Sequence, residues 1–90
     1  MRVDRYLHCI RLVKSRTLAQ TLIAEGYVRI DGKRVEKPSE EVRAGSIVAL
    51  PLRGSVRILK VLGLPDRRGP PPEARTFYQE LGIDAGNAAT

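Results

Sequence analysis

The chain has 90 residues, which suits one small domain and makes a second independent domain improbable. Sixteen lysines and arginines against ten acidic residues give a net charge of +6, so we expect a polyanionic partner, nucleic acid ahead of an anionic membrane. A single cysteine excludes an internal disulfide, and no run approaches the roughly 18 apolar residues of a membrane span. We expect a cytoplasmic protein.

The first predicted helix covers residues 4–13. Val3, Leu7 and Ile10 follow one another at intervals of three or four residues, the spacing of one apolar helix face. Asp4 lies near the N-terminal end of this helix, where the helix dipole favours an acidic side chain. The helix is therefore predicted to be amphipathic.

The polar side of this helix carries cations and two rings. Arg5 and Arg11 point away from the apolar face. Tyr6 and His8 interrupt this side, and rings beside cations can stack on unpaired bases. Ordinary surface or packing roles remain open for both, and for His8 they are the preferred interpretation.

A second helix is predicted from the next apolar repeat, which consists of Leu18, Ala19, Leu22 and Ile23. Ser15 is suited to cap its first turn, and Thr17 is a second candidate cap. Arg16 and Gln20 are left together on another face, where they can meet a partner. Gly26 commonly closes a helix in the left-handed conformation, so the helix is predicted to end just before it.

A β-hairpin should follow at once. Residues 28–30 alternate between apolar and cationic side chains. Asp31-Gly32 is a dipeptide that a two-residue type I′ turn favours, and residues 33–35 begin the return strand.

Two further strands complete a small, mostly antiparallel sheet that covers one side of the helices. An apolar strand is predicted over residues 47–50, ended by Pro51. A turn at residues 53–55 leads into another strand over residues 56–62.

The last third changes character. Residues 63–90 are predicted as a proline-rich linker, a short helix and a frayed tail. The helix is expected to begin at Pro72 and to stop at Gly82, with Phe77 and Leu81 docking it.

A set of residues in the helix and hairpin region carries a family resemblance: Ser15, Arg16, Ala19, Leu22, Ile23, Gly26, Val28, Ile30, Gly32 and Val35. In this order and with these gaps they resemble the S-four-type RNA-binding domain, also called the alpha-L motif. In that family two short helices and the following hairpin form one positively charged surface for structured RNA. The resemblance implies an α+β alpha-L RNA-binding fold over residues 1–62, with a short C-terminal helix after it.

The opening residues 1–7, together with Arg11, Lys14 and Arg16, narrow the resemblance to the heat-shock protein fifteen family. Residues 67–80 resemble the region that follows the domain in that family. The resemblance implies binding to free large ribosomal subunits that still carry a stalled nascent chain on tRNA. The expected partners are therefore ribosomal RNA, the large ribosomal subunit and, as a further candidate, peptidyl-tRNA, with no membrane and no indicated oligomer.

The candidate RNA-binding residues are Arg5, Arg11, Lys14, Ser15, Arg16, Thr17, Gln20, Arg29, Asp31, Lys33 and Arg34. Tyr6 and His8 are candidates for base stacking. We predict no catalytic residue, metal ligand or cofactor, because the sequence has no metal-ligand cluster, nucleophile and base pair, or phosphate-cradling glycine loop.

Two alternatives remain open. A helix-turn-helix protein that binds DNA also joins two helices by a short turn, but its second helix must present several base-reading side chains, and apolar residues occupy much of this one. A protein-interaction module in ribosome assembly is the other alternative, since Phe77 and Tyr78 could contact a partner. An enzyme is the weakest hypothesis.

Overall fold

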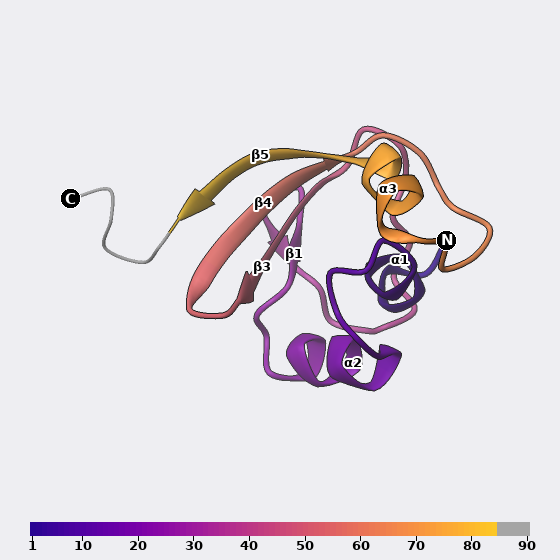
Figure 1. Cartoon of the computed structure of the whole chain (residues 1–90). Helices are drawn as coiled ribbons and strands as arrows, with labels where there is room; N and C mark the ends of the chain where they lie inside the picture. Colours follow the sequence, from indigo (N-terminus) through magenta and orange to yellow (C-terminus); the bar gives the residue numbers. More distant parts are fainter. Residues whose placement is uncertain (85–90) are drawn as a thin grey trace.

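Two short helices lie against one face of a five-stranded antiparallel sheet in the computed structural model, which describes residues 1–84 (Figure 1). The helical elements are α1 (Val3–Cys9), α2 (Arg16–Ala24), α3 (Pro71–Ala74) and the 3₁₀ helix η1 (Arg75–Phe77). The strands are β1 (Arg29–Ile30), β2 (Lys33–Arg34), β3 (Ile47–Leu52), β4 (Ser55–Val61) and β5 (Tyr78–Asp84). Their order across the sheet is β2-β1-β3-β4-β5. This arrangement confirms the predicted α+β fold class.

Helix α1 is shorter than the helix predicted over residues 4–13, because the backbone turns at Arg11. Arg11 has φ 63, in the left-handed region that ends a right-handed helix. The N–H groups of Leu12 and Val13 then both donate to the carbonyl of Leu7, at 3.1 and 3.4 Å. Val13 consequently reaches the core from the loop and not from the helix.

Helix α2 begins and ends where the sequence predicts. The hydroxyl of Ser15 accepts a hydrogen bond from the N–H of Leu18 at 3.1 Å, so Ser15 is the N-cap. Thr17, the alternative cap, lies inside the first turn of the helix. Gly26 has φ 82 shortly after the end of the helix, as the closing residue was expected to have.

The hairpin between β1 and β2 also forms as predicted. Asp31 and Gly32 have φ values of 52 and 83, both positive, as a type I′ turn requires. Each of the two strands contains two residues, and β1 pairs with β3 on its other side.

The prediction that Pro51 ends its strand is wrong. Strand β3 continues to Leu52, and Pro51 lies opposite Val56 of β4. Proline lacks the N–H group that a central strand needs, but here β1 pairs with β3 only as far as Ala49. Pro51 therefore occupies an edge position of β3 on the side of β1.

The predicted terminal helix is also wrong over most of its length. A short helix is present, but it is α3 with the turn of η1, and Tyr78–Asp84 form strand β5 along the free edge of β4. Gly82 is a strand residue opposite Ile58 and not a helix stop. Pairing with β4 satisfies backbone groups that a helix would have left exposed on β4, so the tertiary contact overrides the local pattern.

The docking residues of that predicted helix behave differently from each other. Phe77 packs against the core as expected, whereas Leu81 is 48% exposed. Of the predicted frayed tail, residues 83 and 84 belong to β5, and the rest lies outside the described residues.

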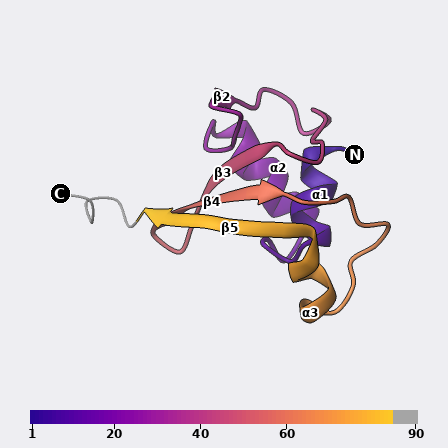
Figure 2. The same ribbon diagram turned by 90° about the horizontal axis from the view of Figure 1, so that it is seen from above.

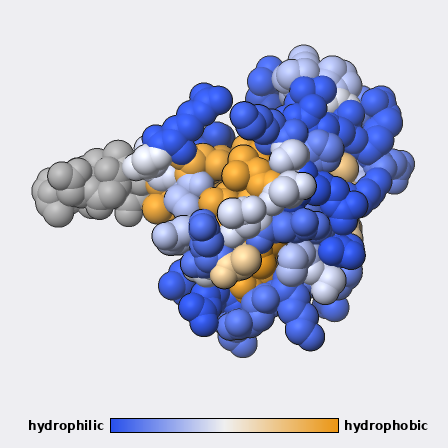
Figure 3. All heavy atoms as spheres, turned by 90° about the horizontal axis from the view of Figure 1, so that it is seen from below, coloured by the Kyte–Doolittle hydropathy of each residue, from blue (hydrophilic) through white to orange (hydrophobic). Residues whose placement is uncertain are grey.

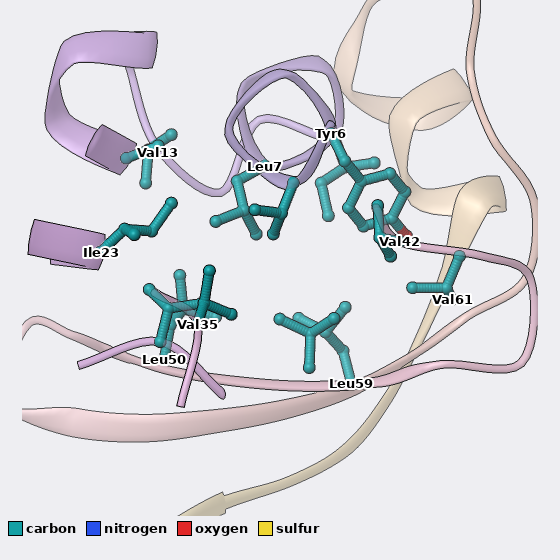
Figure 4. Close-up of a cluster of buried hydrophobic side chains, with 14 residues drawn as sticks. Tyr6, Leu7, Val13, Ile23, Val35, Val42, Leu50, Leu59 and Val61 are labelled. Atoms are coloured by element: carbon teal, nitrogen blue, oxygen red, sulfur yellow. The ribbon is translucent and has the colours of Figure 1, made fainter. Parts of the chain in front are cut away.

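The core fills the space between the two helices and the sheet (Figure 4). Leu7 of α1 and Ile23 of α2 face Leu50 of β3 and Leu59 of β4. Cys9 is also buried, outside this cluster, and is a free cysteine. Figure 2 looks onto the face of the sheet that lies away from α1 and α2, with these two helices behind it. The helices thus cover one face of the sheet.

Candidate nucleic-acid interface

A buried carboxylate organises the polar side of the two helices. Asp4 has 0% exposure, and its Oδ2 atom accepts hydrogen bonds from Arg2 at 3.1 Å, Arg16 at 3.2 Å and Gln20 at 3.0 Å. The backbone N–H of Arg5 donates to Oδ1 at 2.7 Å. Asp4 belongs to α1, so α1 fixes the positions of Arg16 and Gln20. These are the two residues predicted to lie together on a free face of α2.

The charge of Asp4 is maintained by these donors. Burial alone would raise the pKa of Asp4, but the hydrogen bonds from Gln20, Arg2 and Arg16, with the positive charge of Arg16, outweigh it and hold the pKa below its ordinary value. The Asp4 carboxylate thus neutralises part of the positive charge of Arg2 and Arg16 and also fixes the positions of their side chains. The side chains of Arg2 and Arg16 remain 46% and 41% exposed. Both can still donate to a phosphate.

The chain after the sheet docks onto α1 through arginines. Arg5 and Arg11 donate to backbone carbonyl oxygens of residues 66–69, and Arg68 donates from that segment to the carbonyl of His8 at 3.0 Å. Two of the predicted RNA ligands therefore also attach this segment. Arg68 joins the cationic surface, whereas the sequence predicts it in a linker.

His8 of α1 is half-buried and lies near several cations. Burial lowers the pKa of His8, and the charges of Arg68, Arg16 and Arg11 lower it further. We call the set of Arg2, His8, Arg11, Arg16 and Arg68 the helix patch. Arg11, Arg16 and Arg68 lie near enough to His8 for their charges to act on it, and Arg2 shares the Asp4 carboxylate with Arg16. The one sequence signal for Arg2 was its place beside an acid at a helix start.

The stacking hypothesis for Tyr6 is wrong. The side chain of Tyr6 has 0% exposure, and its hydroxyl donates to the carbonyl of Phe77 at 3.0 Å. Burial raises the pKa of Tyr6 well above its ordinary value, so it stays a neutral donor. The sequence pattern placed it on the polar side of a longer helix, but the docked C-terminal segment covers that position.

The cations of the hairpin divide between its two faces. Arg29 and Arg34 are directly opposite each other in the register and so share one face, whereas Lys33 is opposite Ile30 and lies on the other. All three cations are exposed. Arg34 also passes close to Gly26, where an added Cβ would lie 3.1 Å from its Cδ. The hairpin therefore extends the cationic surface from the end of α2, but not on a single face.

Several predicted contact residues have structural roles. The Asp31 carboxylate accepts from the N–H of Ile47 at 2.9 Å and so ties the hairpin turn to β3. The Ser15 hydroxyl caps α2. Thr17 and Lys14 are exposed near the start of α2, beside the helix patch in sequence.

Neither a metal centre nor a membrane span is found in the described part. Residues 1–84 contain no group of three or more histidine, cysteine or acidic side chains that could hold a metal ion. No helix in this range combines the length and the apolar character needed to cross a membrane.

The fold and the helix patch define a domain class. The S4 domain family model matches residues 1–48, more than half of the chain, and the chain belongs to this family. This range contains α1, α2, the hairpin and the start of β3. The predicted S-four-type domain is thereby confirmed.

Individual relatives narrow the comparison. The chain is 32% identical over 80 residues to the heat shock protein 15 homolog of Haemophilus influenzae, covering 89% of this chain and 60% of that one. It is 31% identical over 78 residues to the RQC P-site tRNA stabilizing factor of Helicobacter pylori, covering 87% of this chain and 92% of that one. The trimeric structure of Vibrio cholerae heat shock protein 15 superposes with a TM-score of 0.86 at 30% identity, over 91% of this chain and 82% of that one. The predicted resemblance to the heat-shock protein fifteen family is confirmed, although the chain spans about 60% of the Haemophilus protein.

Proposed function

We propose that this chain binds structured RNA on the ribosome. Its proposed targets are ribosomal RNA of the large subunit and peptidyl-tRNA left there by a stalled nascent chain. The name of the Helicobacter relative, which this chain covers almost end to end, supports a target of this kind. The role is rescue or quality control, without a catalytic step of its own.

The observation that carries this proposal is the fixed position of Arg16. Its guanidinium is held on the buried Asp4 carboxylate, while 41% of its side chain stays exposed. The Nε–H of Arg16 has no hydrogen-bond acceptor among the described residues, although it is buried. A guanidinium that is already ordered loses less side-chain entropy when it binds a phosphate. The helix patch is therefore suited to a rigid, folded RNA backbone.

The first experiment is a salt titration on purified ribosomal RNA. If about five phosphates are neutralised, log K should fall with log salt at a slope of roughly −3.5 to −4.5. Between about 50 and 200 mM salt this is a loss of roughly a hundredfold to five-hundredfold. Arg16→Gln should reduce the magnitude of the slope by about 0.7 to 0.9, because one phosphate contact is lost.

Lys60→Gln is the matched control. Lys60 is exposed on β4, outside the helix patch, and its removal costs the same single charge. The control should leave the slope nearly unchanged. A slope near zero for the parent, or equal losses for the two variants, would contradict the proposed site.

Target identity needs a second experiment. The parent should cosediment with large ribosomal subunits that carry peptidyl-tRNA, and Arg16→Gln should weaken that association. Duplex DNA at matched salt should compete poorly with ribosomal RNA, because apolar residues occupy much of α2. Equal competition by duplex DNA would favour the helix-turn-helix alternative.

A further inference from the structure

A groove with an apolar floor and a cationic rim opens beside the helix patch. It lies where three parts of the chain meet: the loop between α1 and α2, the turn between β3 and β4, and the segment that leads to β5. The part of it that Leu12, Leu18, Leu22 and Leu52 line has a volume of about 440 Å³, within the range of small-ligand sites. Figure 3 views the molecule from the side on which α2 lies and shows an apolar area bordered by hydrophilic surface.

The floor of this groove is made of four leucines, which come from the loop between α1 and α2, from α2 and from β3: Leu12, Leu18, Leu22 and Leu52. All four are partly buried and pack against the core from its outer side. Leu12 borders all three parts of the hollow, so we call it the Leu12 groove.

The rim of the Leu12 groove carries six cations: Arg11, Lys14, Arg53, Arg57, Arg68 and Arg75. Glu80 pairs with Arg57 and offsets one of these charges. Lys14, Arg53 and Arg75 are exposed. The floor thus lies in a strongly positive field, whose sign is complementary to phosphate.

Arg53 occupies an unusual backbone position on this rim. It has φ 53 and precedes Gly54 at φ 82, so it stands at the first central residue of a type I′ turn. Asparagine, aspartate and glycine are the residues that this position favours, and a longer side chain there costs stability. Replacing Arg53 by asparagine therefore removes the cation while suiting the turn.

We propose that the Leu12 groove binds one unpaired nucleotide of the RNA. Its base would lie on Leu12 and Leu52, and its flanking phosphates would be held by Arg53 and Lys14. A fully paired helix keeps its bases stacked inside, so it would leave the leucines facing water or phosphate. An unstacked base presents an apolar face to the floor, and arginine planes on the rim can stack on it.

This inference rests on the proposed RNA binding, and the geometry connects the two. Arg11 and Arg68 belong both to the helix patch and to the rim of the groove. A backbone that follows the helix patch is therefore led directly to the groove. An acidic peptide would also meet the cations, but it has no flat base to lie on the leucine floor.

The experiment compares two labelled RNA duplexes by fluorescence anisotropy, one with a single unpaired nucleotide and one fully paired. The parent should bind the bulged duplex more tightly. Arg53→Asn should weaken binding of the bulged duplex about threefold to tenfold, as the loss of one partly exposed charged contact implies, and should barely affect the paired one. Lys60→Gln should leave the preference for the bulged duplex unchanged.

A second variant tests the floor. Leu12→Ser should also reduce the preference for the bulged duplex, with the salt slope unchanged, because an apolar contact releases few ions. Its melting temperature shows whether the fold survives, and Arg53→Asn decides the question if it does not.

The outcomes separate the two proposals. If the parent binds both duplexes equally and Arg16→Gln weakens both, the groove proposal is overturned while RNA binding stands. If the parent binds neither duplex but still binds ribosomal RNA, the groove proposal fails while RNA binding stands; if it binds no RNA at all, both fail. Competition by polyglutamate or by anionic vesicles that depends on Arg53 but not on Arg16 would also overturn the nucleotide assignment.

Discussion

Replacing Asp4 by asparagine should destabilise the fold more than its small chemical change suggests. Asparagine keeps one oxygen for the N–H of Arg5, but its amide group takes the place of Oδ2, which accepts from three donors. Two of these bonds come from arginines, and hydrogen bonds to charged groups contribute about 1.5–3 kcal/mol each. Arg2 and Arg16 are 46% and 41% exposed and can recover water, which reduces the cost. We expect a loss of about 2–3 kcal/mol in the free energy of unfolding.

The pH dependence of this loss follows from the lowered pKa of Asp4. A carboxyl whose pKa is lower in the folded state stabilises the fold fully above its unfolded pKa, near 3.9. That stabilisation is lost as pH falls through the folded pKa. The difference between parent and variant should therefore be constant from about pH 5 to 7 and should narrow below about pH 4.

Urea unfolding at pH 7, 5 and 3 measures this difference directly. The melting temperature at pH 7 should fall by roughly 8 to 24 °C, since each kcal/mol shifts a domain of this size by about 4–8 °C. Gln20→Ala is a useful control, because it removes one neutral donor and leaves the charges. Equal stability of parent and Asp4→Asn at pH 7, or a difference that does not narrow on acidification, would refute the reasoning.

Two other predictions concern stability and its separation from binding. Gly32→Val should cost about 1–3 kcal/mol, because φ is 83 there and a β-branched residue resists it, whereas Arg34→Ala should cost less; equal melting temperatures for parent and Gly32→Val would contradict the turn assignment. Tyr6→Phe should cost about 0.5–1.5 kcal/mol through its lost bond to the Phe77 carbonyl, without changing RNA affinity at any salt concentration. A fall in affinity with unchanged stability would show instead that the Tyr6 hydroxyl contacts the RNA.

The residues around the start of β5 show where local patterns mislead. Phe77 and Leu81 are four residues apart, which is helical spacing, and a preceding proline suits a helix start. The helix nevertheless stops after η1, because the free edge of β4 pairs with Tyr78–Asp84. No local signal in those seven residues reveals that an unpaired strand edge is available.

The candidate site likewise combines residues whose proximity the sequence predicts with residues that only the fold brings together. The sequence predicts Arg11, Lys14 and Arg16 near one another, because the link between two short amphipathic helices is only a few residues long. It did not place Arg68 beside His8 or Arg53 beside Leu12, because these pairs are joined by contacts across 60 and about 40 residues. It also left Tyr6 on the surface, where the C-terminal segment in fact covers it.

The sequence by itself therefore determined the elements whose causes lie within a few residues. The cap at Ser15, the left-handed Gly26 and the Asp31-Gly32 turn follow from side-chain hydrogen bonds and backbone sterics that neighbours alone decide. The tertiary structure decided the burial of Asp4, the strand β5 and the Leu12 groove. These depend on which distant segments pack together, and that choice is made by the free energy of the whole core and sheet, which no short stretch of sequence contains.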